Sequence, residues 1–143
     1  MSEPAAARSL RSLREGQRAE FAFEIGAEQM RAFAALSGDH NPLHADPAFA
    51  LARGFEGEVV YGGLLVAQVS RLIGMELPGR FAVWHRLQID FRKPLYVGQP
   101  ARLSAEIQHV SEAASALTLK FRIESGGEIL ASGSAGVRVM DDG

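Results

Sequence analysis

The stretch YGGLLVAQVSRLIGMEL, residues 61–77, decides the fold of this chain. Between Gly62 and Met75 only Gln68, Ser70 and Arg71 are polar, so a helix of about four turns here would be apolar nearly all round. A helix with so little polar surface has to be buried on most of its sides. The rest of the chain must therefore supply a surface that covers it.

The segments that follow this helix have the alternation of β-strands. Apolar and polar residues alternate in four successive segments, which are residues 85–91, 101–110, 115–125 and 128–140. Ser125-Gly126-Gly127 predicts a hairpin turn between the last two. These signals predict consecutive antiparallel strands, which have one apolar face to bury.

The segments before the helix mix the two periods. Residues 17–26 alternate like a strand, and residues 27–38 have helical spacing with Gly38 as a stop. Residues 46–54 predict a short helix with Asp46 as its N-cap. The fold class is therefore α+β, and we expect a curved antiparallel sheet wrapped around the central apolar helix.

Length and composition limit what the protein can be. The chain has 143 residues, 15 basic against 17 acidic side chains, and no cysteine. One domain is expected, over residues 16–143, after a flexible segment at 1–15 in which a short basic targeting helix is the alternative. The charge gives no reason to expect nucleic acid or a membrane as partner, and no apolar run is long enough to span a bilayer. We expect a cytoplasmic protein without thiolate chemistry.

Polar residues are concentrated in SGDHNPLHAD, residues 37–46. Pro42 restricts Asn41 to extended conformations, so we expect a fixed, non-helical loop. A carboxylate (Asp39) and an imidazole (His44) on one stiff loop can both approach a single water, which suits general acid–base catalysis. The alternative is structural, with Asp39 and Asn41 forming turns and His44 lying at the surface.

The glycine pair at the start of the helix is a second candidate feature. Gly62 and Gly63 leave backbone N–H groups uncrowded at a helix N-terminus, where they suit an oxygen that gains negative charge. Close packing of the backbone is the alternative reason for two glycines. Together with the loop and an apolar helix, the pair fits proton abstraction or water addition next to a thioester carbonyl.

These residues carry a resemblance. FAALSGDHNPLHADPAFA resembles the signature of the MaoC-like, or (R)-specific enoyl-CoA hydratase, family of hot dog folds. The shared pattern is an aspartate, a variable residue, Asn-Pro, an aliphatic residue and a histidine, here residues 39–44. The similarity continues through VVYGGLL and IDFRKPLYVGQP and extends over about residues 16–139. It implies a single MaoC-like hot dog domain.

The resemblance also implies a reaction and roles for its residues. The reaction is addition of water to a trans-2-enoyl thioester, carried by coenzyme A or acyl carrier protein, and the reverse dehydration. Asp39 and His44 carry over as the catalytic dyad, whose individual roles stay open. Gly62 carries over as the backbone donor to the thioester oxygen, Asn41 as a residue that orients the loop, and Ser70 as a support from the helix. No metal or redox cofactor is implied, and subunits of this fold pair into a homodimer or a higher even oligomer.

Two positions depart from the family pattern. Tyr61 stands where histidine is usual, and Gly63 stands where methionine is usual. Loss of the methionine side chain predicts extra space beside the acyl group, and Tyr61 would close one wall or bond to a polar substituent. We therefore expect a longer, branched or polar acyl chain.

Other functions and other residues stay in view. YGGLL is also similar to the helix entry of hot dog acyl-CoA thioesterases, and a non-catalytic acyl-thioester-binding subunit or an acyl-carrier-protein dehydratase are further alternatives. For the remaining polar and aromatic candidates we expect structural or solvent-exposed roles, including a solvated strand end at the basic pair; they are His40, His85, His109, Trp84, Arg92 and Lys93.

Overall fold

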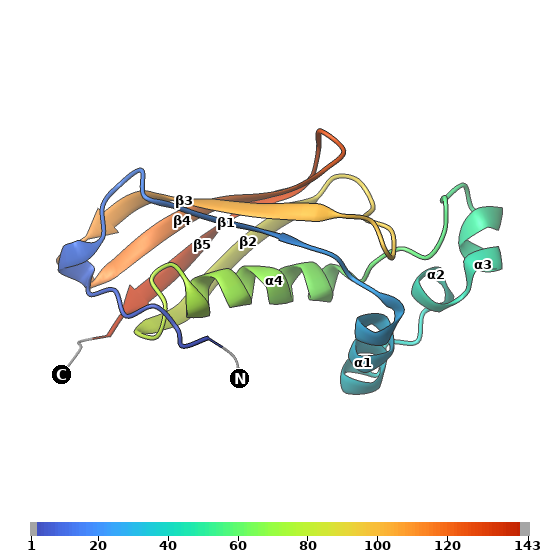
Figure 1. Ribbon diagram of the computed structural model, residues 1–143, viewed down its shortest axis with the longest axis horizontal. Coiled ribbons are helices and arrows are strands. Elements are labelled where there is room, and N and C mark those ends of the chain that lie inside the picture. The colour runs from blue at the N-terminus through green and yellow to red at the C-terminus, as the bar shows by residue number, and fades with distance from the viewer. Residues whose placement is uncertain (1–2, 141–143) are drawn as a thin grey trace.

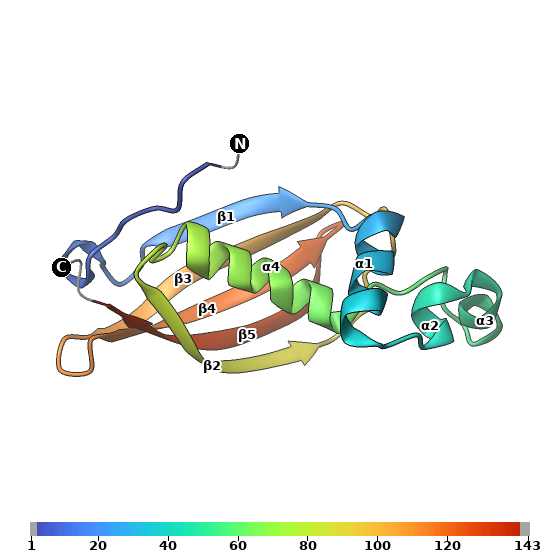
Figure 2. The same ribbon diagram turned by 90° about the horizontal axis from the view of Figure 1, so that it is seen from below.

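The computed structural model describes residues 3–140 and contains one antiparallel sheet with helices on one face and at one end (Figures 1 and 2). In chain order the elements are η1 (Leu10–Ser12), β1 (Arg18–Phe23), α1 (Ala27–Ser37), α2 (Pro42–Ala45), α3 (Pro47–Ala52), α4 (Gly62–Met75), β2 (Ala82–Phe91), β3 (Ala101–Ser111), β4 (Ala116–Ser125) and β5 (Glu128–Val139).

The sheet has five strands in the order β1-β3-β4-β5-β2, and every pairing is antiparallel. It curves around α4, which lies along its inner face (Figure 2). This arrangement confirms the predicted sheet wrapped around a central helix. Because β2 follows α4 and pairs with β5 at the far edge, β1 and β2 are the two edge strands.

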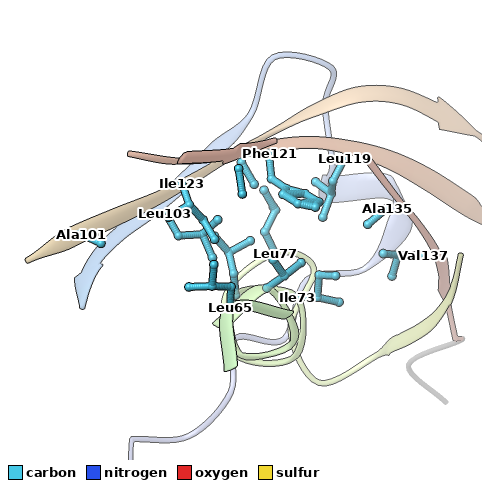
Figure 3. Packing of buried hydrophobic residues seen from close by; sticks show 14 of the residues in the cluster. Leu65, Ile73, Leu77, Ala101, Leu103, Leu119, Phe121, Ile123, Ala135 and Val137 are labelled. Carbon is cyan, nitrogen blue, oxygen red and sulfur yellow. The ribbon is translucent and has the colours of Figure 1, made fainter. Parts of the chain in front are cut away.

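The core lies between α4 and the sheet. Leu65, Val69, Leu72 and Ile73 recur at helical spacing on one side of α4, and all four are buried. Figure 3 shows this side facing inward side chains of the sheet such as Phe121. Since side chains alternate across a strand, every second residue from Ala101 to Ile107 in β3 and from Leu117 to Ile123 in β4 joins this layer.

The other side of α4 is not covered within one chain. Gly63, Ala67, Ser70 and Arg71 are exposed, although the sequence predicts burial on most sides of this helix. The residues on this side are mostly small, so they expose little apolar area per residue. The sheet therefore covers one side of α4 and leaves a narrow face of small side chains open.

Residues 3–15 make several contacts with the rest of the domain. Leu13 is only 2% exposed and belongs to the core. The backbone N–H of Ala6 donates to the carbonyl of Met75, and Nε of Arg8 donates to the carbonyl of Glu76. Ala6 and Arg8 therefore bind at the C-terminal end of α4, because that end offers carbonyls without helical partners.

The histidines and the tryptophan of the sheet have structural surroundings. Trp84 packs against the core and donates from Nε1 to the carbonyl of Arg86 at 2.7 Å. His109 lies 3.3 Å from Glu15, and both side chains are exposed. Among residues 3–140 no three metal-binding side chains come together, and no helix is long and apolar enough to cross a membrane.

Candidate active site

The polar loop between α1 and α2 contains a short helix that the sequence analysis missed. Pro42–Ala45 forms a single helical turn, so the prediction of a non-helical loop is wrong for these residues. Asn41 is extended, as expected before a proline, and its Oδ1 accepts from the N–H of Leu43 at 3.0 Å. Proline is well suited to the first helical position because the N–H that it lacks would have no helical partner there.

Asp39 lies just before this turn, in a loop held by its own side chains. Its Oδ1 accepts from the N–H of Asn41 at 3.1 Å, and its backbone N–H donates to Oγ of Ser37 at 3.0 Å. The carboxylate is exposed. The loop therefore fixes the backbone of Asp39 and leaves its charge in contact with solvent.

His44 is half-buried, and its ring orientation is set by one backbone carbonyl. Nδ1 lies 2.6 Å from the carbonyl oxygen of Val59. A carbonyl can only accept, so Nδ1 carries the hydrogen. In the neutral ring, Nε2 then has a free lone pair and can accept a proton.

The segment before α4 ties this carbonyl to the sheet. The N–H of Val59 donates to the carbonyl of Leu43, and that of Val60 donates to Leu95 at 2.8 Å. The N–H of Val97 donates in turn to the carbonyl of Glu58. Val59 therefore positions His44, and sequence reasoning missed it because a backbone carbonyl leaves no residue-type signal.

A cavity of about 340 Å³ joins His44 to the start of α4. Its walls are mainly apolar, with two basic residues beside them; the lining residues are His44, Phe55, Val59, Val60, Gly62, Leu65, Phe91, Arg92, Lys93, Pro94 and Leu95. A larger hollow of about 740 Å³ lies beside η1, at the opposite end of the sheet from α2 (Figure 1), and contains none of the predicted site residues.

The two glycines at the start of α4 face different surroundings. Gly62 lines the cavity, and a Cβ atom on it would lie 3.0 Å from Cζ of Phe91. A Cβ atom on Gly63 would lie only 2.3 Å from Cζ of Phe33. The space expected beside the acyl group at Gly63 is thus filled by the ring of Phe33, because α1 packs against this turn of the helix. Both N–H groups lie in the first helical turn, where no intrahelical acceptor is available.

Tyr61 is buried and does not line the cavity. Its side chain is 2% exposed, and its hydroxyl donates to the backbone carbonyl of Asp39 at 2.6 Å. The ring stacks on His44 with centroids 4.1 Å apart and an interplanar angle of 26°. Burial, together with the negative charge of Asp39, raises the pKa of the Tyr61 hydroxyl above its usual value. The hydroxyl thus faces the loop backbone and not an acyl chain.

The remaining predicted residues lie around this centre. Asn41 caps α2, and Ser70 is exposed on the open side of α4, outside the cavity lining. His40 is exposed, as expected. Arg92 and Lys93 are exposed just after the end of β2, as expected, and both also line the cavity. The structure therefore brings together His44 and Gly62, with Asp39 linked to them through Tyr61.

A curved antiparallel sheet wrapped around one central helix is the hot dog fold. Residues 9–125 match the MaoC like domain family, and the chain therefore belongs to it. The protein is an enzyme of the hydro-lyase class.

Individual relatives are similar to this chain over most of its length. An (R)-specific enoyl-CoA hydratase of Aeromonas caviae is 39% identical over 132 residues, which cover 92% of this chain and 98% of that protein. The solved (R)-hydratase from A. caviae involved in PHA biosynthesis has a TM-score of 0.87 at 38% identity, covering 90% of this chain and 98% of that one. The R-hydratase from Pseudomonas aeruginosa has a TM-score of 0.89 at 25% identity, covering 96% and 89%.

Proposed function

We propose that the protein is an (R)-specific enoyl-CoA hydratase, which adds water to a trans-2-enoyl thioester and catalyses the reverse dehydration. The observation that carries this proposal is the cavity that contains both the His44 imidazole and Gly62 at the start of α4. A base and an oxyanion donor in one apolar cavity are the two groups that addition next to a thioester carbonyl requires.

The hydrogen bond from His44 to Val59 supports a role for each member of the dyad. Because Nδ1 carries the hydrogen, Nε2 can accept a proton from water. The water oxygen forms a bond to C3 of the enoyl group while that proton moves to Nε2. Asp39 accepts the second hydrogen of the water and so orients it, since its exposed carboxylate keeps acceptor sites.

The second half of the reaction returns the proton. As the bond to C3 forms, the π electrons move toward the thioester, and the oxygen of its carbonyl becomes negative. The N–H of Gly62 donates to that oxygen. The proton on Nε2 then passes to C2, so that hydrogen and hydroxyl add from one side and His44 returns to its neutral form.

The carrier of the acyl group would leave the cavity past its basic residues. Arg92 and Lys93 border the cavity, and Lys93 is neutralised by Glu128, whose Oε1 lies 2.7 Å from Nζ. Arg92 is therefore the cation best suited to a phosphate of coenzyme A. The chemistry itself needs no metal or redox cofactor, because it transfers only a proton and a hydroxyl.

The exposed apolar residues of the edge strand β2 support a homodimer. Val83, Leu87 and Phe91 of the edge strand β2 are 42%, 38% and 53% exposed, although they are apolar. An exposed, apolar edge strand is suited to pairing with a second copy, which would extend the sheet. The cytoplasmic location expected from the sequence stays a prediction.

The proposal is tested by incubating the purified protein with crotonyl-CoA and following loss of the enoyl absorbance. The product enantiomer is then identified by chiral chromatography, and (R)-3-hydroxybutyryl-CoA is expected. Release of free thiol, measured in the same reaction, would indicate thioester hydrolysis instead. Absence of both signals with enoyl groups of all chain lengths, on coenzyme A and on acyl carrier protein, would favour the non-catalytic binding subunit.

A thioesterase is the weaker candidate for this cavity. Residues 62–75, which form α4, include no aspartate or glutamate. A thioesterase would need a carboxylate on the central helix as its base. The proposed hydratase mechanism instead depends on the side chains of Asp39 and His44, which lie near the start of the same helix.

A further inference from the structure

Tyr61 contacts both members of the dyad from the start of α4, outside the loop that carries them. Its hydroxyl donates to the carbonyl of Asp39 at 2.6 Å, and its ring stacks on His44 at 4.1 Å. The ring of Phe33 also lies against the Tyr61 ring, with centroids 4.7 Å apart and an interplanar angle of 44°. Three rings from α1, the start of α4 and α2 thus lie in series, with Tyr61 in the middle.

The position of Tyr61 in the chain adds a third connection. Tyr61 is the N-cap residue of α4, and the next residue is Gly62, the proposed oxyanion donor. The backbone of Tyr61 therefore sets where that N–H points, while its side chain sets where the dyad lies. One buried residue relates the three groups that have to meet around one substrate.

Few other contacts could do this. Oδ1 of Asp39 accepts from the N–H of Asn41, and Asn41 in turn accepts from the N–H groups of Leu43 and His44. These bonds are local, so they shape the loop without fixing its distance from α4. The contact of His44 with Val59 fixes the imidazole but does not reach Asp39. The raised pKa of the Tyr61 hydroxyl keeps this group protonated at neutral pH, so it remains a hydrogen-bond donor.

We propose that Tyr61 is a positioning residue, which holds Asp39 and His44 in register with the N–H of Gly62 and so acts on turnover, not on substrate binding. The proposal rests on the function proposed above. It replaces the expectation that Tyr61 selects the acyl chain, because the buried hydroxyl is already bonded to the loop.

The test compares two substitutions at this position. Tyr61→Phe keeps the ring and loses the hydroxyl, and should lower kcat by about 3- to 10-fold, the scale of one hydrogen bond. Tyr61→Leu loses the stacking as well, and should lower kcat by about 100-fold, since a misplacement of about 1 Å can cost that much. In both, KM for crotonyl-CoA should stay within about twofold of wild type.

Tyr96→Phe is the matched control, because the chain has only two tyrosines. The Tyr96 hydroxyl also bonds to a backbone group, accepting from the N–H of Glu56 at 3.1 Å, but it lies outside the cavity. This variant should lose stability to a similar extent while keeping the wild-type kcat. An equal loss of kcat in both Tyr→Phe variants would overturn the proposal, as would a rise in KM with unchanged kcat at Tyr61.

A spectroscopic measurement separates this proposal from the proposed function. In protein with ¹⁵N-labelled histidine, the ring signals of His44 are assigned by their loss in His44→Gln. We expect these signals to shift in Tyr61→Leu and to remain in place in Tyr96→Phe. Unchanged signals in a folded Tyr61→Leu would overturn the positioning role. A wild-type protein without hydratase activity but with the expected shift would refute the proposed function alone.

Discussion

The contact between Gly63 and Phe33 gives a prediction that differs from the one made from the sequence, which expects free space for the acyl group beside Gly63. Adding a single carbon in Gly63→Ala places a Cβ atom 2.3 Å from Cζ of Phe33, where ordinary contacts begin at 3.4 Å. The Phe33 ring would have to move by about 1 Å to relieve this overlap. Since that ring lies against Tyr61, the displacement should reach the dyad.

The expected change in the free energy of unfolding is the difference between the cost of overpacking and the gain in helix propensity. Overpacking costs about 1–3 kcal/mol, and replacing glycine by alanine in a helix returns less than about 1 kcal/mol. The Phe33 ring is only half-buried and can turn toward solvent, which places the cost at the lower end. We expect Gly63→Ala to lower the free energy of unfolding by about 1 kcal/mol and kcat by about 10-fold.

Gly74→Ala is the matched control on the same helix. A Cβ atom on Gly74 would meet nothing within 4 Å, so this change should raise stability by about 0.5–1 kcal/mol and leave kcat unchanged. The assays are urea unfolding and specificity constants for enoyl-CoA substrates of increasing chain length. A fall in kcat that is uniform over chain lengths is expected for Gly63→Ala. An intact kcat with a shifted chain-length preference would show that this position lines the acyl pocket and would refute the reasoning.

Four further predictions concern the dyad, the carrier, the assembly and pH. Asp39→Asn and His44→Gln should each lower kcat by about 100-fold or more in folded protein, and near-native hydration rates would remove both from the mechanism. Arg92→Ala should raise KM for coenzyme A thioesters with kcat unchanged, less so at high salt; a salt-independent KM would argue against a phosphate contact. Leu87→Lys on the edge of β2 should convert dimer to monomer in light scattering, and an unchanged mass would place the interface elsewhere. Above about pH 10, folded Tyr61 keeps a proton that the unfolded chain loses, because its pKa is raised in the folded state. The free energy of unfolding should therefore fall as pH rises, by at most about 1.4 kcal/mol per pH unit. Tyr61→Phe should show a shallower fall in the free energy of unfolding, and identical slopes would contradict this.

The sequence predicts the fold well where one physical requirement dominates. The apolar residues 62–75 demand a covering surface, and the alternating segments after them can provide only a sheet. The order of the strands was not predicted, because periodicity says which face of a strand is buried and not which strand lies beside it. Only the structure shows that β2 follows α4 to the far edge of the sheet.

The errors have local physical causes. Residues 42–45 were expected to be non-helical because Pro42 excludes helical conformations for the residue before it. The same proline favours a helix that starts with itself, and Asn41 supplies the cap. The composition of the N-terminal segment does not predict its contacts, which are the burial of Leu13 and the bond from Ala6 to the carbonyl of Met75.

The candidate site is predictable in its residue types and unpredictable in its contacts. The spacing of Asp39 and His44 indicates acid–base chemistry, and the glycine pair indicates an uncrowded helix start. The carbonyl of Val59 could not be foreseen, since it lies 15 residues from His44 and any residue type would provide it. It nevertheless decides which nitrogen of the ring carries the proton.

The two departures from the family pattern are connected in the structure. Tyr61 places a large ring between α4 and the loop, and Phe33 packs on that ring from α1. The Phe33 ring reaches this place only because Gly63 has no side chain, since a Cβ atom there would overlap it. A methionine at position 63 would therefore displace the ring that supports Tyr61. The tyrosine and the glycine thus belong to one packing arrangement beside the loop that carries Asp39 and His44. We therefore expect neither residue by itself to indicate the length of the acyl chain.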